Sequence, residues 1–151
     1  MNLYSQYSAA AYCPFNTANT TTHQPILCPT GSCPLLSFLS HSPYVHGSFL
    51  NRDPSFGTAF LAISPHDKTL ILSFCGSEFT AASTSAREEF PDYTLAVTGH
   101  SLGAAQTAFA TAEFRANGTK GEEVWMFDYA QPHLGDLNLA DVEVSIVGRG
   151  V

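Results

Sequence analysis

The pattern of apolar and polar positions divides the chain into an irregular first third and a regular remainder. Leu3, Tyr7 and Ala10 recur at helical spacing, which predicts a short helix over residues 3–12. Residues 13–55 hold most of the nine prolines and few periodic runs, so this segment is predicted to be irregular. The regular secondary structure is therefore expected mainly in the rest of the chain.

Beyond this segment, short β-rich runs alternate with segments of helical composition. Strands are predicted at 56–63, 69–74, 93–98 and 124–129, with 142–147 as a candidate last strand, and helices are predicted at 78–90 and 102–115. Residues 64–68 are typical of a hairpin turn between the first two strands. The alternation predicts one α/β domain over residues 1–151, with a mostly parallel sheet and helices on both faces.

The pentapeptide Gly99-His100-Ser101-Leu102-Gly103 lies where a predicted strand passes into a predicted helix. This pattern in this place is typical of a nucleophile elbow, a strained turn that lifts a serine hydroxyl above the sheet. Gly99 and Gly103 leave room where the strand and the helix approach each other. Ser101 is therefore the candidate nucleophile, and the Leu102 N–H at the helix N-terminus is a candidate oxyanion donor. The alternative is an ordinary turn in which Ser101 is only the N-cap.

A second oxyanion donor is expected from a loop that follows a neighbouring strand. Gly76 and Ser77 come directly after the predicted strand at 69–74, which puts them at its carboxyl end. An ordinary glycine turn that leaves the sheet explains the same two residues equally well.

Charge and composition exclude several classes of function. The chain has 6 basic and 13 acidic residues and a net charge of −7, with no basic cluster, which argues against a nucleic-acid partner. No apolar run is long enough to span a bilayer, and residues 1–12 lack the features of a signal peptide. No set of residues has the spacing of a zinc site, and no cofactor is predicted.

Two of the four cysteines, Cys28 and Cys33, bracket a turn that contains proline and glycine. Such a turn brings two thiols within reach of a disulfide, which is typical of secreted proteins. The alternative is a pair of unrelated buried thiols.

Taken together, these motifs resemble the fungal triacylglycerol lipases of the class 3 family, which also contains feruloyl esterases. The similarity runs from about residue 3 to Asp136, and residues 137–151 diverge from it. The segments that carry it are 5–13, Cys28 to Pro34, 70–77, 90–105 and 129–136. Cys75 stands where the family usually has arginine, and Ala130 and His133 stand where it more often has glycine and arginine.

The resemblance implies an α/β-hydrolase fold, an extracellular location and a carboxylic ester or lipid as substrate. It implies a Cys28–Cys33 disulfide, Ser101 as nucleophile, and Ser77 with Leu102 as oxyanion residues. The protein is expected to be a monomer without a nucleic-acid partner or a transmembrane segment.

Departures from the family predict an incomplete fold. Only residues 78–92 fill the interval in which the family has its lid, a strand and a long helix. Apolar surface on strands 69–74 and 93–98 is therefore expected to be uncovered, with poor soluble expression as the result. The triad aspartate and histidine of the family follow the segment matched by 131–136, and the C-terminal part that would hold them is missing. Cys13, whose family partner lies near the C-terminus, is left over.

Three interpretations of the function follow. The first is a working esterase in which His133 substitutes as the base and Asp136 or Asp141 orients it. The second, which is favoured, is a lipase-like serine ester hydrolase with impaired catalysis, because the triad residues are unmatched. The third is a non-catalytic homologue that binds lipid or a partner. His100 belongs to the elbow and is not placed to act as the base.

Overall fold

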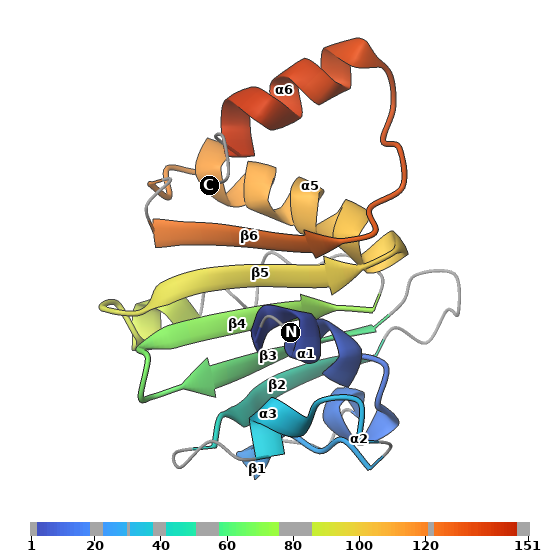
Figure 1. Cartoon of the computed structure of the whole chain (residues 1–151). Coiled ribbons are helices and arrows are strands. Elements are labelled where there is room, and N and C mark those ends of the chain that lie inside the picture. The colour runs from blue at the N-terminus through green and yellow to red at the C-terminus, as the bar shows by residue number, and fades with distance from the viewer. Residues whose placement is uncertain are drawn as a thin grey trace.

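A mixed six-stranded sheet organises the chain (Figure 1). The computed structural model describes residues 3–18, 23–29, 31–37, 42–50, 58–75, 86–120 and 123–147. In order across the sheet, the strands are β1 (Gln24–Pro25), β2 (Tyr44–Leu50), β3 (Thr58–Ser64), β4 (Thr69–Phe74), β5 (Thr94–His100) and β6 (Val124–Tyr129). The helices are α1 (Leu3–Ala10), α2 (Pro14–Thr17), α3 (Pro34–Ser37), α5 (Leu102–Ala116) and α6 (Leu137–Val147), and residues 86–89 form a further helical turn.

The α/β prediction is confirmed, but the sheet is parallel only in part. The neighbours from β1 to β4 are antiparallel, whereas β4, β5 and β6 run parallel. The expectation of a mostly parallel sheet therefore holds only for these last three strands. The reason is the length of the connections: the short turn at residues 65–68 can join β3 and β4 only as a hairpin, whereas α5 provides the long crossover from β5 to β6.

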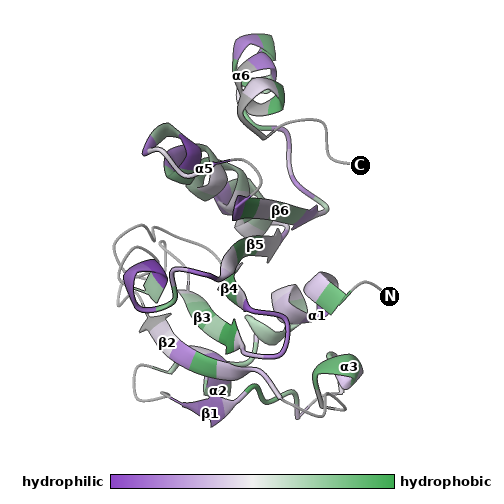
Figure 2. Ribbon diagram, turned by 90° about the vertical axis from the view of Figure 1, so that its left-hand side faces the viewer, coloured by the Kyte–Doolittle hydropathy of each residue, from purple (hydrophilic) through white to green (hydrophobic). Residues whose placement is uncertain are grey.

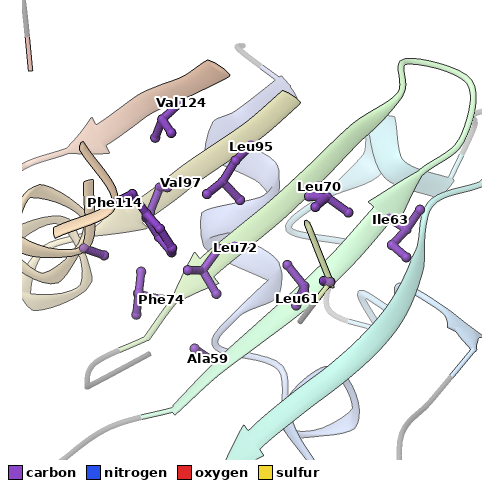
Figure 3. Packing of buried hydrophobic residues seen from close by; sticks show 12 residues of the cluster. Ala59, Leu61, Ile63, Leu70, Leu72, Phe74, Leu95, Val97, Phe114 and Val124 are labelled. Atoms are coloured by element: carbon purple, nitrogen blue, oxygen red, sulfur yellow. The ribbon is translucent and has the colours of Figure 1, made fainter. Parts of the chain in front are cut away.

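Helices cover both faces of the sheet, as predicted, with α1 on one side and α5 on the other (Figure 2). Successive strand residues point to opposite faces, so each central strand contributes to two cores. Leu72 and Phe74 pack with Phe114 of α5 (Figure 3). Ile71 packs on the other face with Tyr7 and Ala10 of α1. The central strands are thus apolar at nearly every position.

The expectation that strands 69–74 and 93–98 expose apolar surface is wrong for the described side chains. Leu70, Leu72, Leu95 and Val97 are fully buried or nearly so. Phe114 of α5 and Ala86 of the helical turn belong to the cluster that covers them. Of the helix predicted at 78–90, residues 78–85 lie outside the described part of the chain.

The prediction of an irregular segment over 13–55 is wrong at β2. This strand pairs with β3 through a register shift between Val45 and Gly47. His46 and Gly47 interrupt the apolar pattern that would have marked the strand, and long-range pairing forms it instead.

The candidate last strand at 142–147 is also wrong, because these residues belong to α6. The Asp136 carboxylate accepts the backbone N–H groups of Asn138 at 3.0 Å and Leu139 at 3.1 Å. The first N–H groups of a helix have no acceptor within it, and this N-cap supplies one. The cap therefore favours a helix over the strand that the alternating pattern had predicted.

Candidate active site

Ser101 occupies the sharp turn between β5 and α5. Its backbone has φ 56° and ψ −121°, a conformation that side-chain-bearing residues adopt only under strain. The turn is held by a hydrogen bond of 2.9 Å from the Ser101 N–H to the Tyr129 carbonyl at the end of β6. The strand-to-helix geometry predicted from the pentapeptide is therefore present.

The two glycines of the pentapeptide are required by close packing. A Cβ on Gly99 would lie 2.8 Å from the Thr107 hydroxyl oxygen and closer still to the Gly103 carbonyl. A Cβ on Gly103 would lie 3.1 Å from the Phe74 carbonyl carbon and would overlap its oxygen. Any larger residue at either position would push α5 away from β4 and β5.

The Ser101 side chain is exposed and makes no capping hydrogen bond with α5. This argues against the alternative in which Ser101 serves only as the N-cap. Leu102 is the first residue of α5, so its N–H has no acceptor within the helix. The N-terminal end of the helix dipole also favours negative charge beside Ser101. Ser77, the other predicted oxyanion residue, lies outside the described residues, as does Gly76.

A cavity of about 970 Å³ opens beside Ser101, within the size range of ligand pockets. Its lining comes from α1, from the residues between α1 and α2, from the first two residues of α2, from the loop between Cys28 and Cys33, from the end of β5 with the elbow, and from the end of β6. The lining residues are Ser5, Ser8, Ala9, Tyr12, Cys13, Pro14, Phe15, Pro29, Ser32, His100, Ser101 and Tyr129. Most of these side chains are apolar or aromatic, which suits an apolar ligand.

Tyr12 connects the N-terminal segment to the elbow. Its hydroxyl donates to the His100 carbonyl at 3.1 Å and lies 3.3 Å from His100 Nδ1. Burial, with the nearby Cys75 adding to it, raises the pKa of the Tyr12 hydroxyl. The group therefore stays protonated at neutral pH and remains a hydrogen-bond donor. Burial also raises the pKa of Tyr129.

The structure does not bring the predicted base to the nucleophile. His133 is exposed on the loop between β6 and α6 and is not among the residues that line the cavity. Asp136 serves as the N-cap of α6, and Asp141 is exposed on that helix. Among the lining residues in the described part of the chain, His100 is the only histidine and there is no carboxylate.

The cysteines fall into a bridged pair and two free thiols. Cys28 and Cys33 form a disulfide with a Cα–Cα distance of 5.8 Å, as predicted. Cys13 is free, half-buried and part of the cavity lining. Cys75 is also free and half-buried, and burial raises the pKa of its thiol, which keeps it protonated at neutral pH.

Sequence reasoning found the elbow but missed the cavity wall. Tyr12 and Phe15 are brought to Ser101 by tertiary hydrogen bonds of Tyr12 and Asn16, for which the local pattern gives no signal, whereas the disulfide beside Pro29 was predicted. The described residues include no group of three or more potential metal ligands, and none of the described helices is long and apolar enough to cross a membrane.

Comparison with known proteins agrees with this geometry. A family model described as "Lipase (class 3)" matches residues 33–146. The secreted mono- and diacylglycerol lipase 1 of Fusarium solani is 26% identical over 171 residues, which cover 88% of this chain and 49% of that protein. This chain thus spans about half the length of that curated relative.

Solved structures of fungal lipases have the same fold. The mono- and diacylglycerol lipase from Aspergillus oryzae superposes with a TM-score of 0.77 at 23% identity, over 95% of this chain and 65% of that one. The lipase from Rhizopus microsporus var. chinensis gives 0.76 at 19% identity, over 95% and 61%. The chain therefore has the α/β-hydrolase fold of the fungal lipases over part of their length, and by its match over residues 33–146 it belongs to the class 3 lipase family.

Proposed function

We propose that this chain is a lipase-like serine hydrolase of carboxylic esters, with Ser101 as the nucleophile and with slow turnover. One observation carries the proposal: Ser101 sits in a strained strand-to-helix turn, with its hydroxyl uncapped, at a cavity of about 970 Å³. The names of the relatives suggest a lipid ester, with mono- and diacylglycerols as the first substrates to test. The disulfide and the secreted relative support an extracellular location. We propose that the protein acts as a monomer.

In the proposed reaction, Ser101 Oγ attacks the ester carbonyl carbon and the alcohol leaves, which produces an acyl-enzyme that water then hydrolyses. The Leu102 N–H would stabilise the negative charge on the carbonyl oxygen, and Ser77 is proposed as the second donor. A serine hydroxyl without a base is a weak nucleophile. Because no histidine other than His100 lines the cavity among the described residues, we expect catalysis to be reduced by several orders of magnitude relative to an intact triad.

Covalent labelling with a fluorophosphonate tests this proposal. The wild-type chain is expected to incorporate the probe slowly, and Ser101→Ala is expected to abolish incorporation. Ser145→Ala, which removes an exposed hydroxyl on α6, serves as the matched control and should label like the wild type. Absence of labelling in the wild type would overturn the proposal.

His133→Ala shows whether Ser101 reacts slowly without a general base or whether His133 acts as a substitute base. If labelling is unchanged, Ser101 reacts without help from His133, as proposed here. If labelling is lost to the same extent as in Ser101→Ala, His133 is the base, and the loop between β6 and α6 must bring its ring to the cavity.

A second candidate function is non-catalytic binding of a lipid or a partner. The apolar lining of the cavity and the absence of a carboxylate among its described lining residues favour it. Saturable binding of a fatty acid to a chain that neither labels nor hydrolyses any ester would support this alternative.

A further inference from the structure

The turn that follows α5 carries a motif that the proposed reaction does not use. Asn117, Gly118 and Thr119 form the triplet Asn-X-Thr, in which X is not proline, and this is the acceptor sequence for N-linked glycans. A second such triplet, at residues 19–21, lies outside the described residues. Because these triplets also occur by chance, the surroundings of Asn117 decide whether it suits a glycan.

Backbone hydrogen bonds hold this turn. The Gly118 N–H donates to the Arg115 carbonyl at 3.1 Å. The Thr119 N–H donates to the Phe114 carbonyl at 3.0 Å. These two bonds form the Schellman motif that commonly ends a helix, and Gly118 has the left-handed backbone that the motif requires, with φ 90°. The Asn117 side chain is therefore not needed to end α5.

The Asn117 side chain is exposed, and it has no hydrogen-bond partner in the described part of the chain. Gly118 is exposed as well, and a Cβ added to it would meet no atom within 4 Å. The turn therefore has open space beside it, and a sugar on the Asn117 amide would break no hydrogen bond of the fold.

The other described asparagines differ from Asn117 in sequence and in surroundings. Asn16 is completely buried, and its side-chain amide donates to two backbone carbonyls. The Asn138 amide donates to the Asp136 carboxylate at 3.2 Å. Neither residue is followed two positions later by serine or threonine. Of the asparagines that the structure describes, only Asn117 combines the acceptor triplet with an exposed, unbonded amide.

We infer that Asn117 is an N-glycosylation site and that its glycan leaves the cavity beside Ser101 open. The inference rests on the extracellular location in the proposed function, because such glycans are attached to secreted proteins. In the transfer, Asn117 Nδ2 forms a bond to C1 of the first sugar of a lipid diphosphate oligosaccharide. The bond between C1 and the diphosphate oxygen breaks, the lipid diphosphate leaves with the electron pair, and Nδ2 releases one proton.

Asn117 and Ser101 stand at opposite ends of α5. Ser101 precedes this helix of 15 residues and Asn117 follows it. At a helical rise of about 1.5 Å per residue, the two residues are about 24 Å apart. α5 runs back along the sheet from the end of β5, which carries the turn away from the elbow (Figure 1). Residues 117–119 are not among those that line the cavity. The glycan is therefore expected to add solubility without contacting the substrate.

Secretion of the full chain from yeast, behind a heterologous leader, tests the inference. Asn19→Gln, which removes the other triplet, is the reference protein, and a cooperative urea transition shows that it is folded. Trypsin cuts after Arg115 and Lys120, and peptide 116–120 is expected to carry an N-linked glycan. Release by peptide N-glycosidase F in oxygen-18 water should leave the heavy isotope on residue 117. Deamidation of Asn117 before this treatment introduces no heavy isotope and is thereby distinguished.

Variants made in the reference protein show whether the triplet is the cause. Asn117→Gln and Thr119→Ala should both abolish the glycan on peptide 116–120. Thr119→Ser keeps an acceptor triplet and should keep the glycan. An unglycosylated peptide 116–120 in the folded, secreted reference protein would overturn the inference.

Fluorophosphonate labelling separates this inference from the proposed function. Glycosylated and enzymatically deglycosylated reference protein are expected to label Ser101 at equal rates. Slower labelling of the glycosylated form would mean that the glycan reaches the cavity, which would overturn its inferred position. If neither form labels, the proposed hydrolase function fails, and a glycan on Asn117 still supports the site. If Ser101 labels and Asn117 is unglycosylated, the inference fails and the hydrolase function stands.

Discussion

The two faces of the central sheet are held together in different ways. On the α5 face, the core cluster consists of aliphatic and aromatic side chains such as Leu72, Phe74 and Phe114, and the buried Thr107 bonds only within α5. On the α1 face, buried polar side chains lie among the apolar ones. Ser73 donates to the Tyr7 carbonyl at 2.9 Å, and Thr98 donates to the Phe127 carbonyl at 2.8 Å.

This difference follows from what each face has to position. Apolar burial is strong but non-directional, so it stabilises α5 without fixing any group to a fraction of an ångström. Hydrogen bonds contribute less net stability but prescribe distance and angle. The cavity lies on the α1 side, where Ser8, Asn16 and Tyr12 fix the backbone around Ser101. The α5 face therefore supplies stability, and the α1 face supplies geometry.

Phe74→Ala is expected to have the largest effect on stability. Phe74 is 1% exposed in the core of the α5 face, and its truncation should cost about 3 to 5 kcal/mol of unfolding free energy. Urea denaturation measures this loss, and Phe109→Ala, with a ring that is 54% exposed, should change stability by less than about 0.5 kcal/mol. Similar losses in the two variants would contradict the assignment of stability to the buried cluster.

Asn16→Ala tests the α1 face. The substitution leaves the carbonyls of Ala10 and Leu27 and the Leu27 N–H without their partner, which should cost about 2 to 3 kcal/mol. It should also slow fluorophosphonate labelling of Ser101, whereas Phe74→Ala should lower stability with the labelling rate kept in the folded fraction. Thr17→Ala, on the same helix, loses only a hydrogen bond of 3.5 Å and should be milder in both respects. A stability loss without a change in the labelling rate would separate Asn16 from the site.

The sequence alone was sufficient to predict the helices and strands that are determined by short-range patterns. β4 and β6 have the predicted bounds, and α5 differs from its prediction by one residue, because apolar runs and an alanine-rich helix are visible in short windows. The elbow could be predicted for the same reason, since Gly99 and Gly103 lie within a few residues of Ser101.

The remainder depends on contacts between distant segments. β2 forms because β3 pairs with it, and Phe15 lies at the cavity beside Ser101 because Asn16, the next residue, is bonded to Ala10 and Leu27. The local hydrophobic pattern contains no sign of these contacts, whereas the Cys28–Cys33 bridge spans only five positions and was predicted from the sequence. α6 was missed for a different reason: its apolar alternation resembles a strand, and the decisive signal was a single capping carboxylate.

Ala130→Gly should change stability less than these variants do, and it should raise stability. Ala130 has φ 54°, a left-handed conformation that costs a residue with a Cβ about 1 to 2 kcal/mol. Glycine removes this strain but adds freedom to the unfolded chain, so a net stabilisation of about 0.5 to 1 kcal/mol is expected. Thermal unfolding should show a raised midpoint, and Ala110→Gly within α5 should show a lowered one. A lowered midpoint in Ala130→Gly would mean that the side chain is needed beside the Tyr129 carbonyl.

The smallest expected effect concerns α6, which depends on a cap and not on either face of the sheet. The backbone N–H of Leu139 and the side chain and N–H of Asn138 bind the Asp136 carboxylate and lower its pKa. The stabilisation of α6 is therefore complete above the ordinary pKa of an aspartate, and it is lost as the pH falls through the lowered value. Amide exchange should show α6 opening on acidification while β4 and β5 stay protected. Asp136→Asn should keep the cap but remove the pH dependence of α6 opening. Asp141→Asn, the control, should retain that pH dependence. If the amide protection of β4 falls together with that of α6, then α6 is coupled to the apolar core. The division of roles between the two faces would then have to include α6.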